Sequence, residues 1–175
     1  MSIICALKIQ GSVWIGSDGR VTDGNFICPE SVYKWRKLGK VWVGLTGNTR
    51  SWLLIDGNEY DTAEDAHACL RAKIEADGWC SDDDVSGPKS HGVSSIYVDA
   101  VGVWHGHSSG SLTNFGGSFC AEGSGREYAY GAAHVYDSGE EFDSPREIMY
   151  KAVTAAIRYD VNCGGNVFVE KLSGY

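Results

Sequence analysis

Short apolar runs dominate the start of the chain, and their spacing predicts strands. Residues 3–9 and 12–17 are rich in Ile and Val and flank a tight turn at Gly11. This pattern predicts a hairpin of buried strands. Comparable runs predict further strands at 40–45, 93–98, 100–105, 115–121 and 166–172.

Helical spacing and capping residues predict helices at 50–55, 63–76, 126–136 and 145–161. Thr62 is expected to cap the second helix. The fourth has the strongest start, with Ser144 as cap, Pro145 at the first helical position and Glu147 three residues after the cap. The order of elements predicts an α+β fold. Two antiparallel sheets would lie between two helix pairs in a four-layer αββα sandwich, formed by a single domain, residues 1–175.

Side chains alternate between residues 32 and 37, which predicts that Val32, Lys34 and Arg36 share one face of a strand. Lys34 is therefore expected mid-strand, between apolar neighbours. Asp18, which follows the second predicted strand, can pair with Lys34 and hold it in place. The alternative is a partly exposed ion pair, which would stabilise the fold little.

The charge balance excludes some classes of partner. The chain has 175 residues, 43% hydrophobic and 22% charged, with a formal net charge of −8. An acidic chain lacks the clustered cations that bind nucleic acid or anionic membrane surfaces. Since no apolar run approaches the roughly 20 residues of a membrane helix, no membrane partner is expected.

The six cysteines are scattered without Cys-x-x-Cys spacing. The N-terminal residues lack the basic and apolar regions of a signal peptide. We therefore expect reduced, mostly buried cysteines and a cytoplasmic location.

The N-terminus itself is a candidate catalytic group, because Ser2 directly follows the initiator Met. A serine hydroxyl is a poor nucleophile until a base takes its proton. A free α-amine, with a pKa of about 7.7–8.0, can be that base at neutral pH. This chemistry requires removal of Met1, which is plausible because Ser is small. If Met1 is retained, Ser2 has an amide nitrogen and the mechanism is lost.

Several short motifs occur in a fixed order along nearly the whole chain. They are Ser2, the segment 18–24 (Asp-Gly-Arg-Val-Thr-Asp-Gly), Lys34, the segment 44–47 (Gly-Leu-Thr-Gly), Gly-Ser-Gly at 123–125, and Arg-Tyr-Asp-Val-Asn-Cys-Gly-Gly at 158–165. In order and spacing the chain resembles the proteasome β-subunit and bacterial HslV peptidase family, within the N-terminal-nucleophile hydrolases. The resemblance implies the αββα fold of that superfamily.

The resemblance also implies the roles of individual residues. Ser2 would be the nucleophile, tuned by Asp18 and Lys34, and the Gly47 N–H would bind the oxyanion. Ser124 and Asp160 resemble the residues that hydrogen-bond the α-amine, although each is as easily explained as closing a helix. The residues expected to line the substrate pocket, or else to be core, are Val21, Thr22, Val32, Leu45 and Thr49.

The implied partners are a polypeptide substrate, further copies of the chain in a homo-oligomeric ring, and an ATPase unfoldase. The chain also departs from the family. Its nucleophile is Ser instead of Thr, Cys163 replaces a Ser, and the loop at 77–91 differs. Its first helix is cut short at Asp56-Gly57, which argues against docking to an ATPase ring.

Two other functions fit the sequence. A catalytically silent, proteasome-like structural subunit of a ring or virion-type assembly would retain Met1. A small-molecule amidase of the superfamily is weaker, because such enzymes often use Cys, and Cys5 is internal. No cofactor or metal is expected. His105-x-His107 lacks a third ligand, and Asp82–Asp84 lacks the glycine and distal Glu of a calcium loop.

Overall fold

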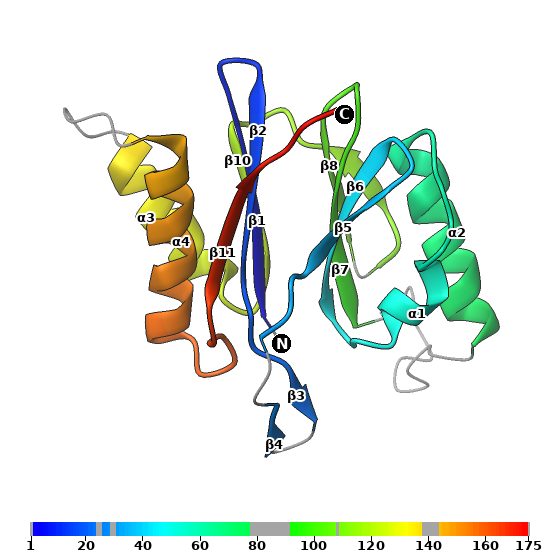
Figure 1. The fold of residues 1–175 in the computed structure, drawn as a ribbon, viewed down its shortest axis with the longest axis horizontal. Coiled ribbons are helices and arrows are strands. Elements are labelled where there is room, and N and C mark those ends of the chain that lie inside the picture. The colour runs from blue at the N-terminus through cyan, green and yellow to red at the C-terminus, as the bar shows by residue number, and fades with distance from the viewer. Residues whose placement is uncertain are drawn as a thin grey trace. The chain divides into compact units, whose positions relative to one another are not determined.

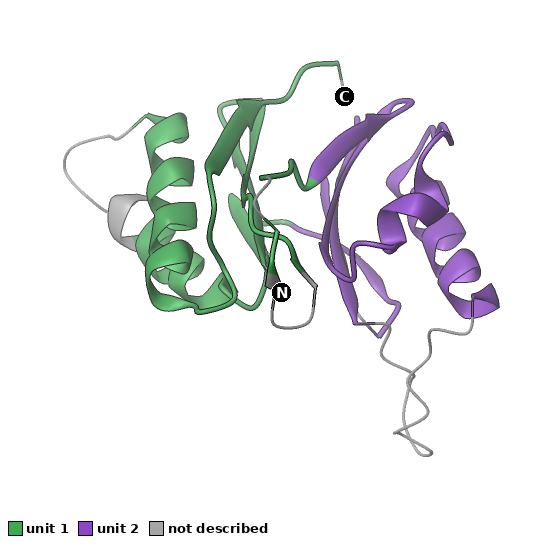
Figure 2. Ribbon diagram, turned by 60° about the horizontal axis from the view of Figure 1, so that its bottom comes forward, with its two compact units in different colours: residues 1–34, 116–174 green, residues 35–115, 175 purple. Residues whose placement is uncertain are grey.

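The computed structural model describes residues 2–23, 26–28, 31–77, 92–107, 109–137 and 144–174. These residues form two compact units, shown in different colours in Figure 2. The first comprises Met1–Lys34 and Gly116–Gly174, and the second comprises Trp35–Phe115. The expectation that residues 1–175 form one domain stays a prediction.

The first unit is built on a four-stranded antiparallel sheet of order β10-β1-β2-β11 (Figure 1). Its strands are β1 (Ile3–Ile9), β2 (Ser12–Asp18), β10 (Phe119–Gly123) and β11 (Val167–Lys171). The predicted N-terminal hairpin is confirmed as β1 and β2. A separate two-stranded ladder joins β3 (Thr22–Asp23) and β4 (Phe26–Ile27).

Two helices, α3 (Arg126–Asp137) and α4 (Pro145–Tyr159), cover one face of this sheet (Figure 1). Alternate residues of β1 point toward them, as expected for a strand with one face on a core. The buried cluster includes Ile3, Cys5, Leu7, Ala129, Met149, Val153 and Ala156. The predicted start of α4 is confirmed, because Ser144 and Glu147 form a complete capping box and Pro145 opens the helix.

The second unit is built on a five-stranded antiparallel sheet of order β5-β6-β7-β8-β9. Its strands are β5 (Trp35–Leu38), β6 (Val41–Gly47), β7 (Val93–Val98), β8 (Val103–Gly106) and β9 (Leu112–Asn114). Its helices are α1 (Ser51–Ile55) and α2 (Ala63–Ala76), and Thr62 caps α2 as predicted. A buried cluster joins these helices to β6 and β7, and includes Val41, Val43, Leu45, Ile55, Leu70, Ile74 and Tyr97.

Some boundaries differ from the prediction. The strand expected from residue 32 begins only at Trp35, so Lys34 lies in a bend before β5 and not mid-strand. The predicted alternation is also wrong, because Lys34 and Trp35 are both buried whereas Val32 and Arg36 are exposed. The reason is a competing hydrogen bond, in which the Val32 N–H donates to the Gly19 carbonyl at 3.1 Å. Because this bond fixes the backbone at residue 32, residues 31–34 do not take part in the strand.

The strand expected near residues 115–121 is also shifted. Phe115 donates to the Val103 carbonyl at 2.7 Å beyond the end of β9, and β10 begins only at Phe119. Most of the loop predicted at 77–91, with its Asp82–Asp84 run, lies outside the described residues. Among the helices that the structure describes, none is long and apolar enough to cross a membrane.

Asp99, in the turn between β7 and β8, joins that turn to the start of α2. One carboxylate oxygen accepts hydrogen bonds from the Val101 N–H, the Gly102 N–H and the Trp104 indole, at 2.9–3.1 Å. The other accepts from the Ala63 N–H, at the N-terminus of α2, at 2.9 Å. Burial opposes ionisation of this carboxyl, but these four bonds hold its pKa below the ordinary value.

Asp99→Asn is therefore expected to lower the free energy of unfolding by about 1.5–3 kcal/mol, because an amide NH₂ replaces an acceptor oxygen. Since the folded-state pKa is depressed, this stabilisation is present above the unfolded pKa of about 3.9 and is lost as the pH falls through the folded value. Urea unfolding at pH 7 and at pH 3 measures both effects. Asp61→Asn is the matched control, because Asp61 pairs with Lys40 on the surface and should change stability by less than about 0.5 kcal/mol.

Candidate active site

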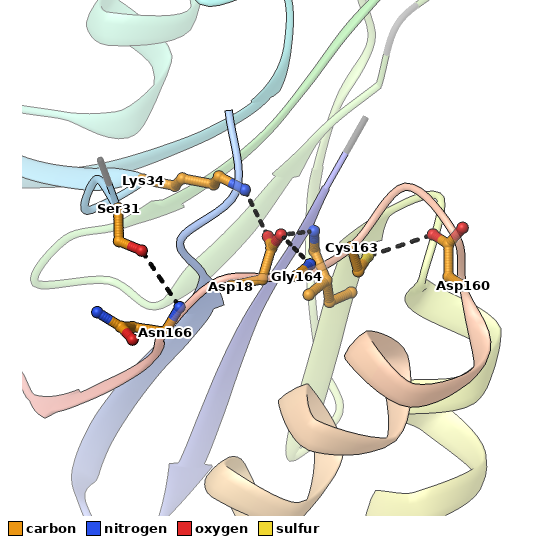
Figure 3. A network of polar contacts seen from close by, with 8 residues as sticks. Asp18, Ser31, Lys34, Asp160, Cys163, Gly164 and Asn166 are labelled. Carbon is orange, nitrogen blue, oxygen red and sulfur yellow. Dashed lines mark hydrogen bonds and ion pairs between the residues drawn. The ribbon is translucent and has the colours of Figure 1, made fainter. Parts of the chain in front are cut away.

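Asp18, the last residue of β2, is the centre of the polar network in Figure 3. Its side chain is fully buried. Oδ1 accepts from the Lys34 ammonium at 2.5 Å and from the Ile3 N–H at 3.0 Å, and Oδ2 accepts from the Gly164 N–H at 3.0 Å. The carboxylate thus joins the first strand, the segment before β5 and the turn before β11.

Lys34 is buried with only 6% of its surface exposed. Burial lowers the pKa of its ammonium group, and the Asp18 carboxylate offsets part of that lowering. A buried lysine is rare unless it is paired. The predicted pairing of Lys34 with Asp18 is observed, and the predicted alternative of a partly exposed pair is wrong.

Ser2 precedes β1 and is also buried. The β1–β10 ladder pairs Ile3 with Gly123, so its register continued by one residue places Ser2 opposite Ser124. Gly123 lies against the Ser2 carbonyl, where a Cβ atom would meet the oxygen at 2.0 Å, and it has a φ of +111°. A glycine is therefore required at this position for the N-terminal residue to lie as it does.

The turn after α4 carries Asp160, the C-cap residue of that helix. Its Oδ1 accepts from the backbone and side-chain nitrogens of Asn162, each at 3.0 Å, and its Oδ2 accepts from the Cys163 thiol at 3.2 Å. Burial raises the pKa of the Cys163 thiol, so the thiol remains a protonated donor. Burial opposes ionisation of Asp160, but its hydrogen-bonding neighbours, Ser124 included, hold its pKa below the ordinary value.

The Ser124 hydroxyl contributes to that lowering, although no hydrogen bond of standard geometry joins it to a partner among the described residues. Ser124 follows β10, and Gly125 beside it lies directly on Cys163, where a Cβ atom would meet Sγ at 2.8 Å. The structure therefore brings together five of the predicted catalytic residues around the start of β1: Ser2, Asp18, Lys34, Ser124 and Asp160.

Arg20 fastens the turn at 161–164 to the end of β2. Its Nη1 donates to the Val161 carbonyl at 2.7 Å, and its backbone N–H donates to the Gly164 carbonyl at 2.9 Å. The guanidinium lies flat on Gly164, where a Cβ atom would fall within 2.4 Å of it. The Asp18 carboxylate and the Asp160 turn are thus held to one another through backbone contacts.

Gly47 ends β6 in the second unit and has a φ of +103°. Its predicted role in binding the oxyanion stays a prediction. Of the residues expected to line a pocket, Val21 is half-buried, whereas Thr22 and Val32 are exposed. In the second unit Leu45 belongs to the hydrophobic core, which was the alternative reading of its sequence position, and Thr49 is exposed.

No group of three metal-binding side chains occurs within the described residues. His105 and His107 do lie close together, with ring centroids 3.7 Å apart, but neither has a further His, Cys, Asp or Glu ligand in that part of the chain. The cysteines at positions 5, 28, 69, 120 and 163 are all unpaired thiols.

Three groups at the site were not predicted from the sequence. They are the Ile3 N–H, the Gly164 N–H and the Ser31 hydroxyl, which accepts from the Asn166 N–H at 3.3 Å. The first two are backbone donors, which no residue type reveals. Gly164 lies in the segment 158–165, one of the motifs on which the resemblance rests. The sequence therefore indicated that this segment belongs to the site, but it did not indicate the contact of Gly164 with Asp18.

No known protein-family model matches the sequence, but solved structures resemble it closely in three dimensions. The Thiobacillus denitrificans BPH in complex with epoxomicin has a TM-score of 0.77 at 18% identity, over 99% of both chains. Another structure of that BPH has a TM-score of 0.78 at 17% identity, over 99% of this chain and 98% of that one. The eukaryotic HslV from Trypanosoma brucei has a TM-score of 0.70 at 24% identity, over 97% and 98%.

At these identities the likeness is one of fold. The predicted α+β class with two antiparallel sheets and flanking helices is confirmed. The chain therefore has the fold of HslV, as its resemblance to proteasome β-subunits and HslV predicted.

Proposed function

We propose that the chain is an N-terminal-nucleophile peptidase in which Ser2, exposed by removal of Met1, attacks the amide bond. The observation that carries the proposal is the buried Asp18–Lys34 pair adjoining Ser2. The Asp18 oxygen that binds Lys34 also binds the N–H of Ile3, the residue that follows Ser2.

Such a pair is difficult to explain by stability alone. Removing two charges from water costs several kcal/mol per ion, and apolar side chains of similar volume often serve a core as well or better. Perturbed, buried ionisable groups cluster at functional sites. Here the pair lies at the end of a strand, beside a small hydroxyl residue that removal of Met1 would place at the N-terminus.

In the proposed reaction the α-amine of Ser2 takes the proton of the Ser2 hydroxyl as Oγ attacks the substrate carbonyl carbon. The Lys34 ammonium stabilises the developing negative charge and keeps the pKa of the amine low. The proton then passes to the nitrogen of the leaving amine as the C–N bond breaks, which leaves an ester on Oγ. Water hydrolyses that ester by the same base, releasing the carboxylic acid and restoring Ser2.

Asp160 and Ser124 are proposed to hold the α-amine. The ladder register supports this for Ser124, because continuing it by one residue beyond the Ile3–Gly123 pair places Ser124 opposite Ser2. The ionised state of Asp160 supports it too, because an anion stabilises the ammonium that forms once the α-amine has taken the proton of the Ser2 hydroxyl. The oxyanion role of Gly47, the ring assembly, the unfoldase partner and the polypeptide substrate stay predictions from the resemblance.

The proposal is tested by the chemical state of the N-terminus and its reaction with epoxomicin, the compound bound in the Thiobacillus denitrificans BPH structure. Intact mass should show that Met1 is absent. After incubation with epoxomicin, the mass should rise by one inhibitor per chain, and peptide mapping should place the adduct on Ser2. A Ser2→Ala protein, treated in parallel, should remain unlabelled.

Retention of Met1 on protein purified from its own cells would refute the proposal and favour the silent structural subunit. An adduct on another residue, or equal labelling of the Ser2→Ala protein, would also contradict it. Turnover of acylated amino acids in preference to peptides would instead indicate the small-molecule amidase.

A further inference from the structure

The segment 31–34 carries Lys34 to Asp18 without forming a helix or strand. Lysine has a long, flexible side chain, so the position of its ammonium depends on how the backbone before it is fixed. In this segment each of the three residues before Lys34 makes its own contact, either with Gly19 directly after β2 or with residues 166–168 around the start of β11. Figure 3 shows one of these contacts beside the Lys34–Asp18 pair.

The first contact is made by Ser31. Its hydroxyl oxygen accepts a hydrogen bond from the Asn166 N–H at 3.3 Å. Two glycines allow this close approach: a Cβ atom on Gly19 would meet the Ser31 Cβ at 2.8 Å, and one on Gly165 would meet its Oγ at 3.0 Å. The second contact is the bond from the Val32 N–H to the Gly19 carbonyl at 3.1 Å.

The third contact is aromatic. The ring of Tyr33 packs on that of Phe168, with centroids 4.1 Å apart and planes tilted by 31°. Phe168 is the second residue of β11, and the edge of its ring also lies against Gly19. Tyr33 is 57% exposed, so this pairing does not serve to bury Tyr33 in the core. Its evident effect is to fix the residue directly before Lys34.

We propose that Ser31 and Phe168 are positioning residues that hold the Lys34 ammonium at Asp18. The inference rests on the proposed function, in which Lys34 acts on the Ser2 nucleophile. Charge–charge energy falls with distance and rises steeply as water is excluded, so a lysine displaced toward solvent loses most of its effect on a neighbouring amine. The α-amine of Ser2 would then have a higher pKa, and a larger fraction of it would be protonated at neutral pH.

The test compares Ser31→Ala and Phe168→Leu with a matched control on the same strand, Val169→Ala. Val169 packs against the hydrophobic core of the first unit, so its truncation lowers stability without loosening residues 31–34. Phe168→Tyr keeps the ring and should restore wild-type behaviour. Urea unfolding confirms that each variant is folded.

Two measurements are made on each variant. Reductive methylation followed by peptide mass spectrometry reports the reactivity of Lys34 itself, independently of catalysis. The rate of Ser2 labelling by epoxomicin against pH reports the α-amine. In Ser31→Ala and Phe168→Leu we expect methylation of Lys34 to accelerate several-fold. The acid limb of the labelling profile should move to higher pH, and labelling at neutral pH should slow by about 10-fold or more.

Unchanged Lys34 reactivity and an unchanged pH profile in both variants would overturn the inference, as would an equal shift in Val169→Ala. Failure of the proposed function has a different signature, because the wild-type protein would then not be labelled at Ser2 at all. A labelled wild type with unaffected Lys34 therefore refutes only the positioning role.

Discussion

Replacing Ser2 with Ala is expected to lower peptide hydrolysis by about 10³-fold or more while leaving the fold intact. Alanine keeps a small residue after Met1, so the initiator should still be removed and the α-amine should still be free. The Asp18–Lys34 pair and the Ile3 N–H are also unchanged. The substitution thus removes the nucleophilic oxygen alone, and loss of a single hydroxyl should cost about 1 kcal/mol of stability at most.

The measurement is steady-state hydrolysis of fluorogenic peptides. Ser12→Ala is the matched control, because Ser12 pairs with Ile9 at the other end of the same hairpin. It also removes a single serine hydroxyl, and it should leave hydrolysis unchanged. Hydrolysis by Ser2→Ala at the wild-type rate would show that another residue is the nucleophile, or that the activity belongs to a contaminant.

The elements of this fold could be predicted from local patterns because most of its boundaries carry local signals. The hairpin of β1 and β2 is predicted by two apolar runs around a glycine turn. The start of α4 is predicted by Ser144, Pro145 and Glu147, and the structure shows the capping-box hydrogen bonds between Ser144 and Glu147. The predicted start of β5 was wrong because no local signal marks it. The bond from Val32 to Gly19 is a tertiary contact, which alternation of side chains cannot report.

The candidate site likewise has features that the sequence indicates and features that depend on tertiary contacts. The resemblance to proteasome β-subunits and HslV, carried by the order and spacing of short motifs, singled out Ser2, Asp18 and Lys34 together. Burial of the Asp18–Lys34 pair was one of two alternatives that the sequence left open, because a lysine and an aspartate in sequence are equally compatible with a surface ion pair. The Gly164 N–H that completes the carboxylate arises only from the approach of a turn 146 residues away.

Asp18→Asn is expected to lower the free energy of unfolding by about 3–5 kcal/mol, because it leaves the buried Lys34 ammonium without its counter-charge. The amide also places an NH₂ group where a donor already points. If the NH₂ group takes the place of Oδ1, Lys34 and the Ile3 N–H lose their acceptor. If it takes the place of Oδ2, the Gly164 N–H loses its acceptor. Hydrolysis and epoxomicin labelling should fall with stability, because the same carboxylate holds the segment next to Ser2.

The pH dependence of the lost stability distinguishes two causes, an uncompensated buried charge and a packing defect. Burial already lowers the Lys34 pKa, and Asp18 opposes that lowering, so the pKa should fall further in the variant. A folded-state lysine pKa below the unfolded value of about 10.4 means that the unfolded chain binds more protons between the two values. Stability of Asp18→Asn should therefore rise with pH across that interval, relative to wild type.

Urea unfolding of wild type, Asp18→Asn, Lys34→Met and the double variant between pH 7 and pH 10 tests this argument. Lys34→Met removes the charge and leaves Asp18 with its two backbone donors, so it should be less damaging than Asp18→Asn. The double variant should recover part of the stability that Asp18→Asn loses, because no unpaired ammonium remains. Additive losses in the two single variants, with no dependence on pH, would show that Asp18 and Lys34 do not act as a buried ion pair.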